Sequence, residues 1–314
     1  MSQTPPFPGP LPGPLPGPLP SGARGFAQHT RFQRVRLALE QAGVGGGWRS
    51  GVYEFLLFGF KQGWACLFGA LLLFLLIATH LFYPRDAALA RYDFLVIAAV
   101  AIQAGLLAFR LETWEEAKVI FAFHLVGTVM ELFKTAHGSW IYPEPSLLRI
   151  GEVPLFSGFM YAAVGSYIAR VWRIFDFQFS HYPPRWATIA LAAAIYVNFF
   201  AHHWLPDVRA ILLGATALLF WRCRIWYRPF RKQRWMPLLL GFFLVALFIW
   251  LAENIGTLSK AWIYPEQREG WSPVSPQKLI AWYLLMIISV VLVSLVHKPR
   301  ERPEGRLVEQ EGIG

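Results

Sequence analysis

Residues 131–144 read ELFKTAHGSWIYPE, and residues 253–266 read ENIGTLSKAWIYPE. Both segments begin with Glu and end in the same five residues, WIYPE. Each residue of the second segment follows its counterpart by 122 positions, as Trp262 follows Trp140. The same offset, without gaps, aligns further polar residues and prolines: His80 with His202, Glu131 with Glu253, and Pro84 with Pro206. Chance similarity among apolar helices explains matched Leu and Phe but not these residues in one register, so we interpret the chain as an internal duplication.

The composition is that of an integral membrane protein rather than a soluble enzyme. Of the 314 residues, 55% are hydrophobic and 15% are charged, whereas soluble domains average about 45–50% apolar and about 25% charged. Most apolar segments approach the roughly 20 residues that a helix needs to cross a bilayer, and in hydrocarbon they satisfy their backbone hydrogen bonds as helices. We place them near residues 64–82, 92–110, 118–134, 154–172, 187–203, 208–221, 236–256 and 277–296. The sequence thus predicts an all-α, polytopic protein with about eight transmembrane helices.

The duplicated unit contains four of these helices. Because four crossings return the chain to its starting side, we expect two parallel four-helix repeats related by an axis along the membrane normal. Both WIYPE segments then face the same side of the membrane. The expected organisation is a disordered Pro- and Gly-rich tail (1–29), an amphipathic or interfacial segment (30–63), a first repeat (64–172), a second repeat (173–296) and a charged cytoplasmic tail (297–314).

The distribution of basic residues predicts the orientation. With the N-terminus inside, 21 of the 29 Lys and Arg residues fall on the inner side and eight on the outer side, as the positive-inside rule requires when both termini are cytoplasmic. One loop on the inner side departs from this pattern, because it has more acidic residues than basic ones. These acidic residues are Glu112, Glu115 and Glu116. The basic and aromatic segment 222–234 (RCRIWYRPFRKQR) is expected to contact anionic lipid headgroups, not nucleic acid.

Two His and two Glu form the candidate polar centre. An ionisable group costs roughly 2.5–3.5 kcal/mol near the centre of a transmembrane helix, so such groups are candidates for function. The duplication places them at similar depth on the outer side: His80, Glu131, His202 and Glu253. The WIYPE aromatics are either interfacial anchors or the rim of an outward cavity, and the rim candidates are Trp140, Tyr142, Glu144, Trp262, Tyr264 and Glu266.

These residue types support several functions. Imidazole and carboxylate bind Zn²⁺ and other divalent metals, a Glu–His pair relays protons in a transporter, and Glu binds lipids or polar ligands through hydrogen bonds. The chain has no HExxH, G-x-S-x-G, P-loop or dinucleotide motif, so no metal, cofactor or catalytic residue is specified. The first hypothesis is a small-solute or ion transporter or binder. The alternatives are a membrane enzyme acting on a lipid or isoprenoid, with or without a metal, and a non-catalytic structural membrane protein in which each Glu only bridges helices.

Four segments together resemble an uncharacterised family of bacterial integral membrane proteins, the YoaT-like domain of unknown function. They are ELFKTAHGSWIYPE (131–144), IGEVPLFSGFMYAAVGSYIARVWRIF (150–175), NFFAHHWLPD (198–207) and AENIGTLSKAWIYPE (252–266). The resemblance covers about residues 50–298. It implies a multi-pass protein of the bacterial inner membrane, and it brings no assigned activity, substrate or catalytic residue.

Overall fold

The computed structural model describes residues 48–84 and 86–302. The chain divides into two compact units, Met1–Tyr53 and Glu54–Gly314. The expected disordered tail, the first part of the expected interfacial segment and most of the expected C-terminal tail lie outside the described residues. Apart from residues 48–53, which begin the first described helix, the arrangement described below belongs to the second unit.

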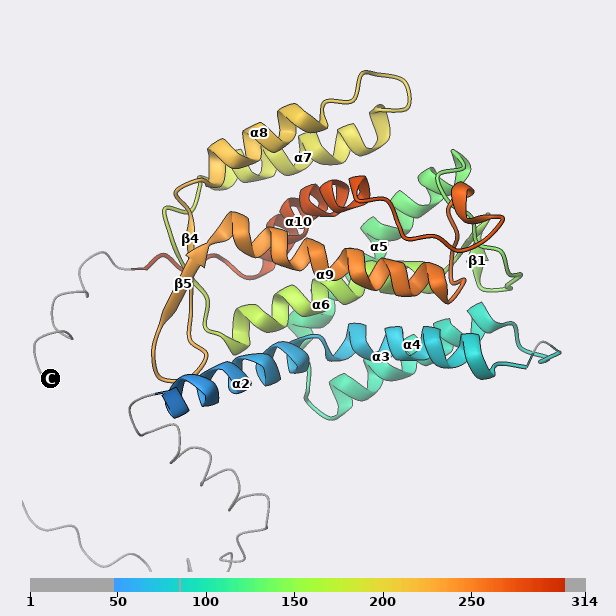
Figure 1. The fold of residues 1–314 in the computed structure, drawn as a ribbon, viewed down its shortest axis with the longest axis horizontal. Coiled ribbons are helices and arrows are strands. Elements are labelled where there is room, and N and C mark those ends of the chain that lie inside the picture. The colour runs from blue at the N-terminus through green and yellow to red at the C-terminus, as the bar shows by residue number, and fades with distance from the viewer. Residues whose placement is uncertain (1–47, 85, 303–314) are drawn as a thin grey trace, which may run out of the picture. The chain divides into compact units, whose positions relative to one another are not determined.

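Each of the eight expected apolar segments forms one helix in the described part of the chain (Figure 1). They are α3 (Leu67–Phe82), α4 (Arg91–Ala108), α5 (Trp114–Ala136), α6 (Phe156–Ile174), α7 (Arg185–Ala201), α8 (Arg209–Phe220), α9 (Leu238–Leu258) and α10 (Gln277–Val296). A further helix, α2 (Trp48–Ala65), runs into α3 with a bend of 67°. The protein is therefore mostly helical, as the sequence predicts.

Fewer helices than eight qualify as membrane spans by length and composition. Four are long and apolar enough, namely α4, α5, α9 and α10, and the bent pair α2 and α3 makes a fifth if it is one span. A helix rises 1.5 Å per residue, so the 17 residues of α7 and the 12 residues of α8 fall short of a hydrocarbon core about 30 Å thick. The structure thus gives four to five candidate spans where the sequence predicts about eight.

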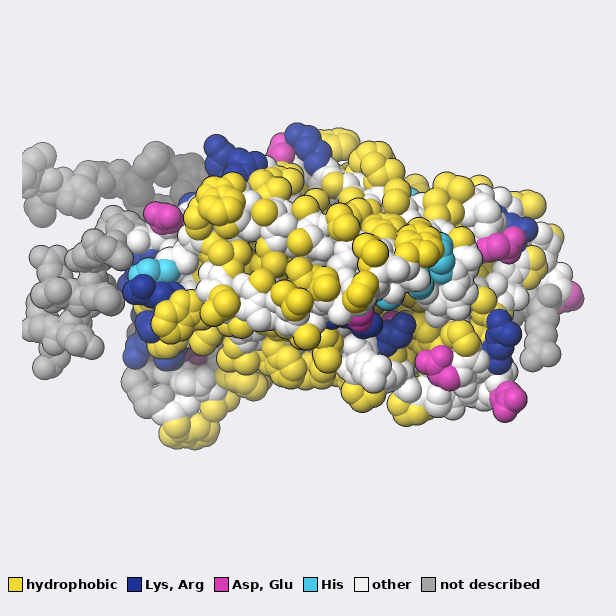
Figure 2. Space-filling view, turned by 90° about the horizontal axis from the view of Figure 1, so that it is seen from above, with side chains coloured by type: hydrophobic (Ala, Val, Ile, Leu, Met, Phe, Trp, Pro, Cys, Tyr) yellow, Lys and Arg dark blue, Asp and Glu magenta, His cyan; other side chains and the backbone are white. Residues whose placement is uncertain are grey.

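The surface of the bundle is strongly apolar. Figure 2 shows hydrophobic side chains spread over much of one face. Among the large hydrophobic residues that are exposed, several lie on candidate spans and on the α7–α8 hairpin: Ile97, Phe121, Leu125, Trp186, Leu218, Trp221, Leu244 and Phe248. Exposed apolar surface on this scale is abnormal for a soluble monomer and normal for a protein surrounded by lipid. The fold is that of a membrane protein.

Two corresponding helix pairs form the centre of the bundle. Helix α5 packs along α6, and α9 packs along α10, while α3 packs on α6 and α7 packs on α10. Helix α5 begins with a capping box, in which Thr113 and Glu116 each bind the backbone N–H of the other. The largest buried apolar cluster lies between these helices and includes Phe123, Phe242 and Ile287.

Short strands occur at both ends of the helices. At one end, β3 (Gln178–Ser180), β4 (Arg224–Tyr227) and β5 (Arg234–Pro237) form an antiparallel sheet in the order β3-β4-β5. We call this the sheet end. At the other end lie the hairpin of β1 (Arg149–Ile150) and β2 (Val153–Pro154) and both WIYPE segments (Figure 1). We call this the WIYPE end.

The two WIYPE segments pair with each other at their second residues. Ile141 and Ile263 form an isolated antiparallel bridge, in which each N–H donates to the other residue's carbonyl at 3.0 Å. The turns that lead into them also match. Gly138, after α5, and Lys260, after α9, both have positive φ, 67° and 53° respectively. These paired turns fix the positions of the side chains that form the candidate site.

Candidate functional site

Glu131 is a buried carboxylate held by three aromatic side chains. It lies in the last two turns of α5 and is 3% exposed. Its Oε2 accepts hydrogen bonds from Trp140 Nε1 at 2.7 Å and from the Tyr142 hydroxyl at 2.6 Å. Its Oε1 accepts one from the Tyr161 hydroxyl of α6 at 2.8 Å. The WIYPE segment therefore folds back over the end of α5 and closes on its carboxylate.

Glu253 has the corresponding environment in α9, where it is 5% exposed. Its Oε1 accepts a short hydrogen bond from the Tyr264 hydroxyl, and its Oε2 accepts one from Trp282 Nε1 of α10 at 2.7 Å. Tyr264 follows Glu253 by eleven residues, as Tyr142 follows Glu131. In both cases the donors are neutral N–H and O–H groups of aromatic rings, which satisfy a carboxylate without neutralising its charge.

The two sets of donors meet in two ring contacts. The rings of Trp140 and Tyr264 meet edge to face with centroids 6.1 Å apart, and those of Tyr161 and Trp282 lie 6.2 Å apart. Lys278, in the first turn of α10, places its Nζ 4.2 Å from the centroid of the Tyr264 ring and 5.5 Å from that of Trp140. We call the two carboxylates, their five aromatic donors and Lys278 the paired-glutamate site.

The phenols of the WIYPE loops remain protonated at neutral pH. Burial, and then the negative charge of Glu131, raise the pKa of Tyr142 well above its usual value. Burial and the charge of Glu253 raise the pKa of Tyr264 in the same way. Because a protonated phenol donates a hydrogen bond and a phenolate cannot, Tyr142 and Tyr264 keep their ability to donate to the carboxylates at neutral pH.

A small cavity lies between α5, α6, α9 and α10, next to these carboxylates. Its volume is about 30 Å³, which is enough for about one water molecule. Tyr161 and Trp282 line the cavity as well as binding the two glutamates, and Gly127 and Ser289 contribute to its wall. Neither carboxylate lines the cavity, so Tyr161 and Trp282 are the residues that connect it to the two glutamates.

The two candidate histidines lie outside this set of hydrogen bonds. His202 follows α7, and its Nε2 lies 3.2 Å from the Nζ of Lys134, one turn beyond Glu131 on α5. The neighbouring His203 Nε2 lies 3.0 Å from the same Nζ. His80 is exposed in the last turn of α3, close to Arg91 and to the turn at Ser259 after α9. The structure thus brings Glu131 and Glu253 together but gives each histidine different partners.

The remaining rim candidates, Glu144, Trp262 and Glu266, lie outside the paired-glutamate site. Glu144 forms an ion pair with the buried Arg91 at 2.7 Å, and Arg91 also donates to the Ser259 carbonyl after α9 at 3.0 Å. Trp262 packs against Gly256, where a Cβ would lie 2.1 Å from the indole. Glu266 is exposed. Within the described ranges, no group of three or more His, Cys, Asp or Glu residues is placed to hold a metal ion.

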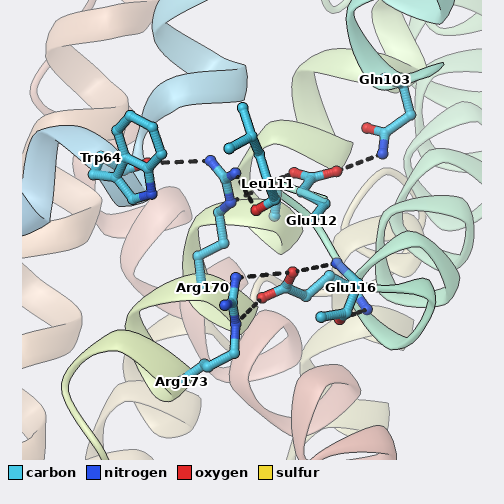
Figure 3. A network of polar contacts seen from close by, with 9 residues as sticks. Trp64, Gln103, Leu111, Glu112, Glu116, Arg170 and Arg173 are labelled. Atoms are coloured by element: carbon cyan, nitrogen blue, oxygen red, sulfur yellow. Dashed lines mark hydrogen bonds and ion pairs between the residues drawn. The ribbon is translucent and has the colours of Figure 1, made fainter. Parts of the chain in front are cut away.

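A second polar network, which the sequence did not reveal, lies towards the sheet end (Figure 3). Arg170 of α6 is fully buried, with its Nε 3.7 Å from Glu112 Oε1. Its guanidinium donates to the Leu111 carbonyl at 2.8 Å and to the Trp64 carbonyl at 3.1 Å. Trp64 lies just before the bend between α2 and α3, so Arg170 supplies a donor beside that break in the helix.

The same network accounts for the acidic residues of the loop before α5. Arg173 of α6 donates to both carboxylate oxygens of Glu116, at 2.9 and 3.3 Å (Figure 3). Glu116 is 1% exposed and Glu112 is 4% exposed. Two of the three acidic residues that outnumber the basic ones in this loop are thus internal partners of α6. The third, Glu115, pairs with Lys118 on the solvent-accessible surface.

Comparison with known proteins identifies the family. Residues 54–290 match the family described as "Protein of unknown function (DUF817)". The chain belongs to the DUF817 family. A member from Bacillus subtilis (strain 168), described as "Uncharacterized protein YoaT", is 42% identical over 249 residues, which are 78% of this chain and 92% of the relative. The expected membership of a YoaT-like family is confirmed.

Solved structures give a weaker likeness. The crystal structure of a mycobacterial Insig homolog from Mycobacterium vanbaalenii is 12% identical, with a TM-score of 0.42, and covers 60% of this chain and 98% of the homolog. A cross-linked trimer of the same homolog gives the same identity and TM-score and covers 61% of this chain.

Sequence reasoning missed four residues of the WIYPE end in this DUF817 chain. Tyr161 and Trp282 donate to the glutamates, and Lys278 and Lys134 lie beside them. The 122-residue offset aligns Tyr161 with Tyr283, but the donor in α10 is the preceding residue, Trp282. In the sequence, the two lysines look like ordinary charged residues at the ends of helices. Only the packing shows that Lys278 lies over aromatic rings and that Lys134 contacts imidazoles.

Proposed function

We propose that this DUF817 protein binds a small polar solute or ion at Glu131 and Glu253, as a membrane-embedded binder or transporter. The paired burial of the two carboxylates carries the proposal. A buried carboxylate without a bonded cation is expensive, and two of them near each other also repel. A residue that only links two helices can be a neutral hydrogen-bond acceptor. A purely structural role therefore does not require the cost of burying two carboxylates. A site that takes up a cation or a proton does.

The proposed architecture is two parallel four-helix repeats. Three features support it: the ends of α5 and α9 are 122 residues apart, the turns at Gly138 and Lys260 share positive φ, and Ile141 pairs with Ile263. An axis between the two isoleucines then relates Glu131 to Glu253. In this arrangement α7 and α8 cross the membrane only with local thinning or tilt of their neighbours, because they are short.

The proposed location is the bacterial inner membrane, with both termini cytoplasmic and the WIYPE end outside. The excess of Lys and Arg on the inner side supports this orientation. At the sheet end, exposed arginines of β4 and β5, such as Arg224 and Arg234, would contact anionic lipid headgroups. The paired-glutamate site would then receive its ligand from the outer side.

The test is binding and flux in the purified full-length protein. Proteoliposomes are exposed separately to gradients of Na⁺, K⁺, protons and choline, and the ligand-induced shift of Tm is measured in detergent for each cation. The variants are Glu131→Gln and Glu253→Gln, which keep the shape of the acceptor but remove its charge. Glu269→Gln is the control, because Glu269 is exposed in the loop after the second WIYPE segment.

We expect at least a tenfold loss of one of these responses in either glutamate variant, and no loss in the control. If both variants keep every wild-type response, the binding proposal is overturned. A change in Tm without any change in ligand response would support the structural alternative instead.

A further inference from the structure

Lys278 occupies a position built from the two halves of the paired-glutamate site. Its Nζ lies 4.2 Å from the face of Tyr264 and 5.5 Å from the face of Trp140. The polar edges of both rings point away from it, since Tyr264 donates to Glu253 and Trp140 donates to Glu131. The faces of both rings are therefore left for a cation. We call this position the ammonium seat.

Aromatic faces backed by carboxylates are what proteins use to recognise ammonium groups. The quadrupole of a Trp or Tyr ring attracts a cation over its face, and a hydrogen bond to a carboxylate makes the ring more electron-rich. The attraction between a ring face and an ammonium group is the same whether that group belongs to a side chain or to a free molecule. The seat is thus complementary to the ammonium of Lys278 and equally to that of a free amine of similar size.

Neighbouring cations do not compete for the seat, because they have partners of their own. Lys134 is bonded to His202 and His203 and lies 4.4 Å above the Phe199 ring. Arg209 pairs with Asp207 at 2.5 Å. Among the described residues, Lys278 is the cation over Tyr264 and Trp140, and its single positive charge offsets part of the charge of the two glutamates.

The duplicated architecture does not require a lysine at this position. The counterpart of Lys278 at the 122-residue offset is Phe156, which begins α6 as a buried ring against Tyr92 and Tyr142. Helix α6 therefore begins and packs without an ammonium group. The lysine is an addition to a seat made by duplicated aromatic residues. A flexible four-carbon stem lets it leave, and the exposed Glu266 lies within electrostatic reach of its ammonium.

We propose that the ammonium seat is a binding site for a small primary or quaternary ammonium compound, and that the side chain of Lys278 occupies it when no ligand is bound. This inference rests on the proposed function and names its ligand class. When the ligand enters, Lys278 moves towards Glu266, and the ligand takes its place over Tyr264 and Trp140. Ligand binding and the departure of Lys278 are thus one exchange of cations, with no change in the charge of the site.

The exchange can be measured by removing the tethered competitor. A tethered group competes at an effective concentration in about the millimolar range, so its removal strengthens binding of a free amine. Isothermal titration of the full-length protein in detergent uses methylammonium and choline chlorides, with NaCl and KCl at equal concentration as comparison ions. The variants are Lys278→Met and, should that variant fold poorly, Lys278→Gln. Lys260→Met removes an exposed lysine of the same end as the control.

We expect the dissociation constant for methylammonium or choline to fall at least tenfold in the Lys278 variants and to stay unchanged in Lys260→Met. Adding Tyr264→Leu to Lys278→Met should abolish the gain, because Tyr264 supplies the nearer ring face. If the Lys278 variants bind neither amine more tightly than Na⁺, or if the gain survives Tyr264→Leu, the inference is overturned. Binding of Na⁺ that depends on Glu131 and Glu253, without any preference for amines, would overturn it while leaving the proposed function intact.

Discussion

Ile141 and Ile263 donate their backbone N–H groups to each other's carbonyls, both at 3.0 Å, although 122 residues separate them. Each is the second residue of a WIYPE segment. In the proposed arrangement of two parallel repeats, the axis that relates the repeats would pass between these two residues. The aromatic residues on either side of this pair are the ones that reach Glu131 and Glu253. The pairing thus explains how one site draws donors from both halves of the chain.

A disulfide between these two positions tests their pairing directly. Hydrogen-bonded antiparallel partners have Cα atoms about 5.5 Å apart, which lies inside the range of about 4.4–6.8 Å for disulfides. The double substitution Ile141→Cys and Ile263→Cys, with Cys66→Ser and Cys223→Ala, should form an intramolecular bridge that shifts mobility in a non-reducing gel. Each single substitution is the control. Labelling of the two new thiols from opposite sides of the membrane would contradict the parallel repeats.

Lys260 should be replaceable by glycine with a gain in stability. Lys260 and Gly138 end the turns after α9 and α5 with positive φ, a conformation that costs a non-glycine residue about 1–2 kcal/mol. Lys260→Gly should therefore raise the free energy of unfolding by about 1 kcal/mol, and Gly138→Ala should lower it by a similar amount. Unfolding in mixed micelles measures both. The two changes in the free energy of unfolding should be similar in size and opposite in sign. A loss of stability in Lys260→Gly would count against the turn geometry.

Gly127 lets Tyr161 approach the backbone of α5. A Cβ at Gly127 would lie 2.5 Å from the Tyr161 ring, so Gly127→Ala should displace the ring and destabilise the protein by about 1–3 kcal/mol. The control is Gly105→Ala in α4, where a Cβ meets nothing within 4 Å and helix propensity favours Ala by about 1 kcal/mol. Because Tyr161 binds Glu131, Gly127→Ala should also weaken any response that Glu131→Gln abolishes.

The helices and the core of the candidate site could be predicted from the sequence. Hydrophobic segments of nearly 20 residues leave few alternatives to helices, and the offset between the WIYPE segments aligned Glu131 with Glu253 before any coordinates. The number of membrane crossings was harder to predict. Residues 209–220, for example, form a helix of only 12 residues, although the apolar stretch around them looks longer. Hydropathy shows how apolar a segment is, but it does not show at which residues the helix begins and ends.

The partners of charged residues could not be predicted. Glu112 and Arg170 are 58 residues apart in sequence and meet only because α5 and α6 pack together. The positive-inside count treats Arg170 as an inner-side loop charge and takes no account of Glu112, although both are buried inside the bundle. Similarly, nothing in the sequence around Lys278 indicates that Trp140 lies next to it. Such contacts depend on tertiary packing, and one sequence contains no record of which helices are neighbours.

Arg170 should be needed for folding. Removing one partner of a buried ion pair leaves the other charge uncompensated and costs about 3–5 kcal/mol. Arg170→Met should therefore lower the free energy of unfolding by about that amount, and Glu112→Gln in the same chain should recover part of the loss because it removes the orphaned charge. The exposed pair Glu115 and Lys118 gives the comparison, since Lys118→Met should cost about 0–1 kcal/mol. A loss in the double variant equal to the sum of the single ones would exclude coupling between Arg170 and Glu112.

The stability of the WIYPE end should fall in mild acid. Burial, and then the positive charges of Lys134, His202 and His137, lower the pKa of His203 below its ordinary 6.5. The unfolded chain therefore binds a proton at this residue more readily than the folded one. The contribution of this exposed histidine to folding stability is fully present above about pH 6.5 and is lost as the pH falls through its lowered folded-state pKa. Protonation also removes the acceptor that Lys134 uses at 3.0 Å. Asp207 and Arg209 of the α7–α8 loop face the same cluster.

The acid sensitivity is measured as the difference between Tm at pH 7.5 and Tm at pH 5.5, in the wild type and in His203→Gln. The side-chain oxygen of the introduced Gln can still accept a hydrogen bond from Lys134 but does not titrate. The decrease in Tm on acidification should be smaller in His203→Gln than in the wild type. It should be unchanged in His181→Gln, because His181 is exposed at the sheet end, far along the chain from Lys134. An equal decrease in all three proteins would place the acid sensitivity elsewhere and would leave Lys134 bonded to His203 as a static contact between α5 and α7.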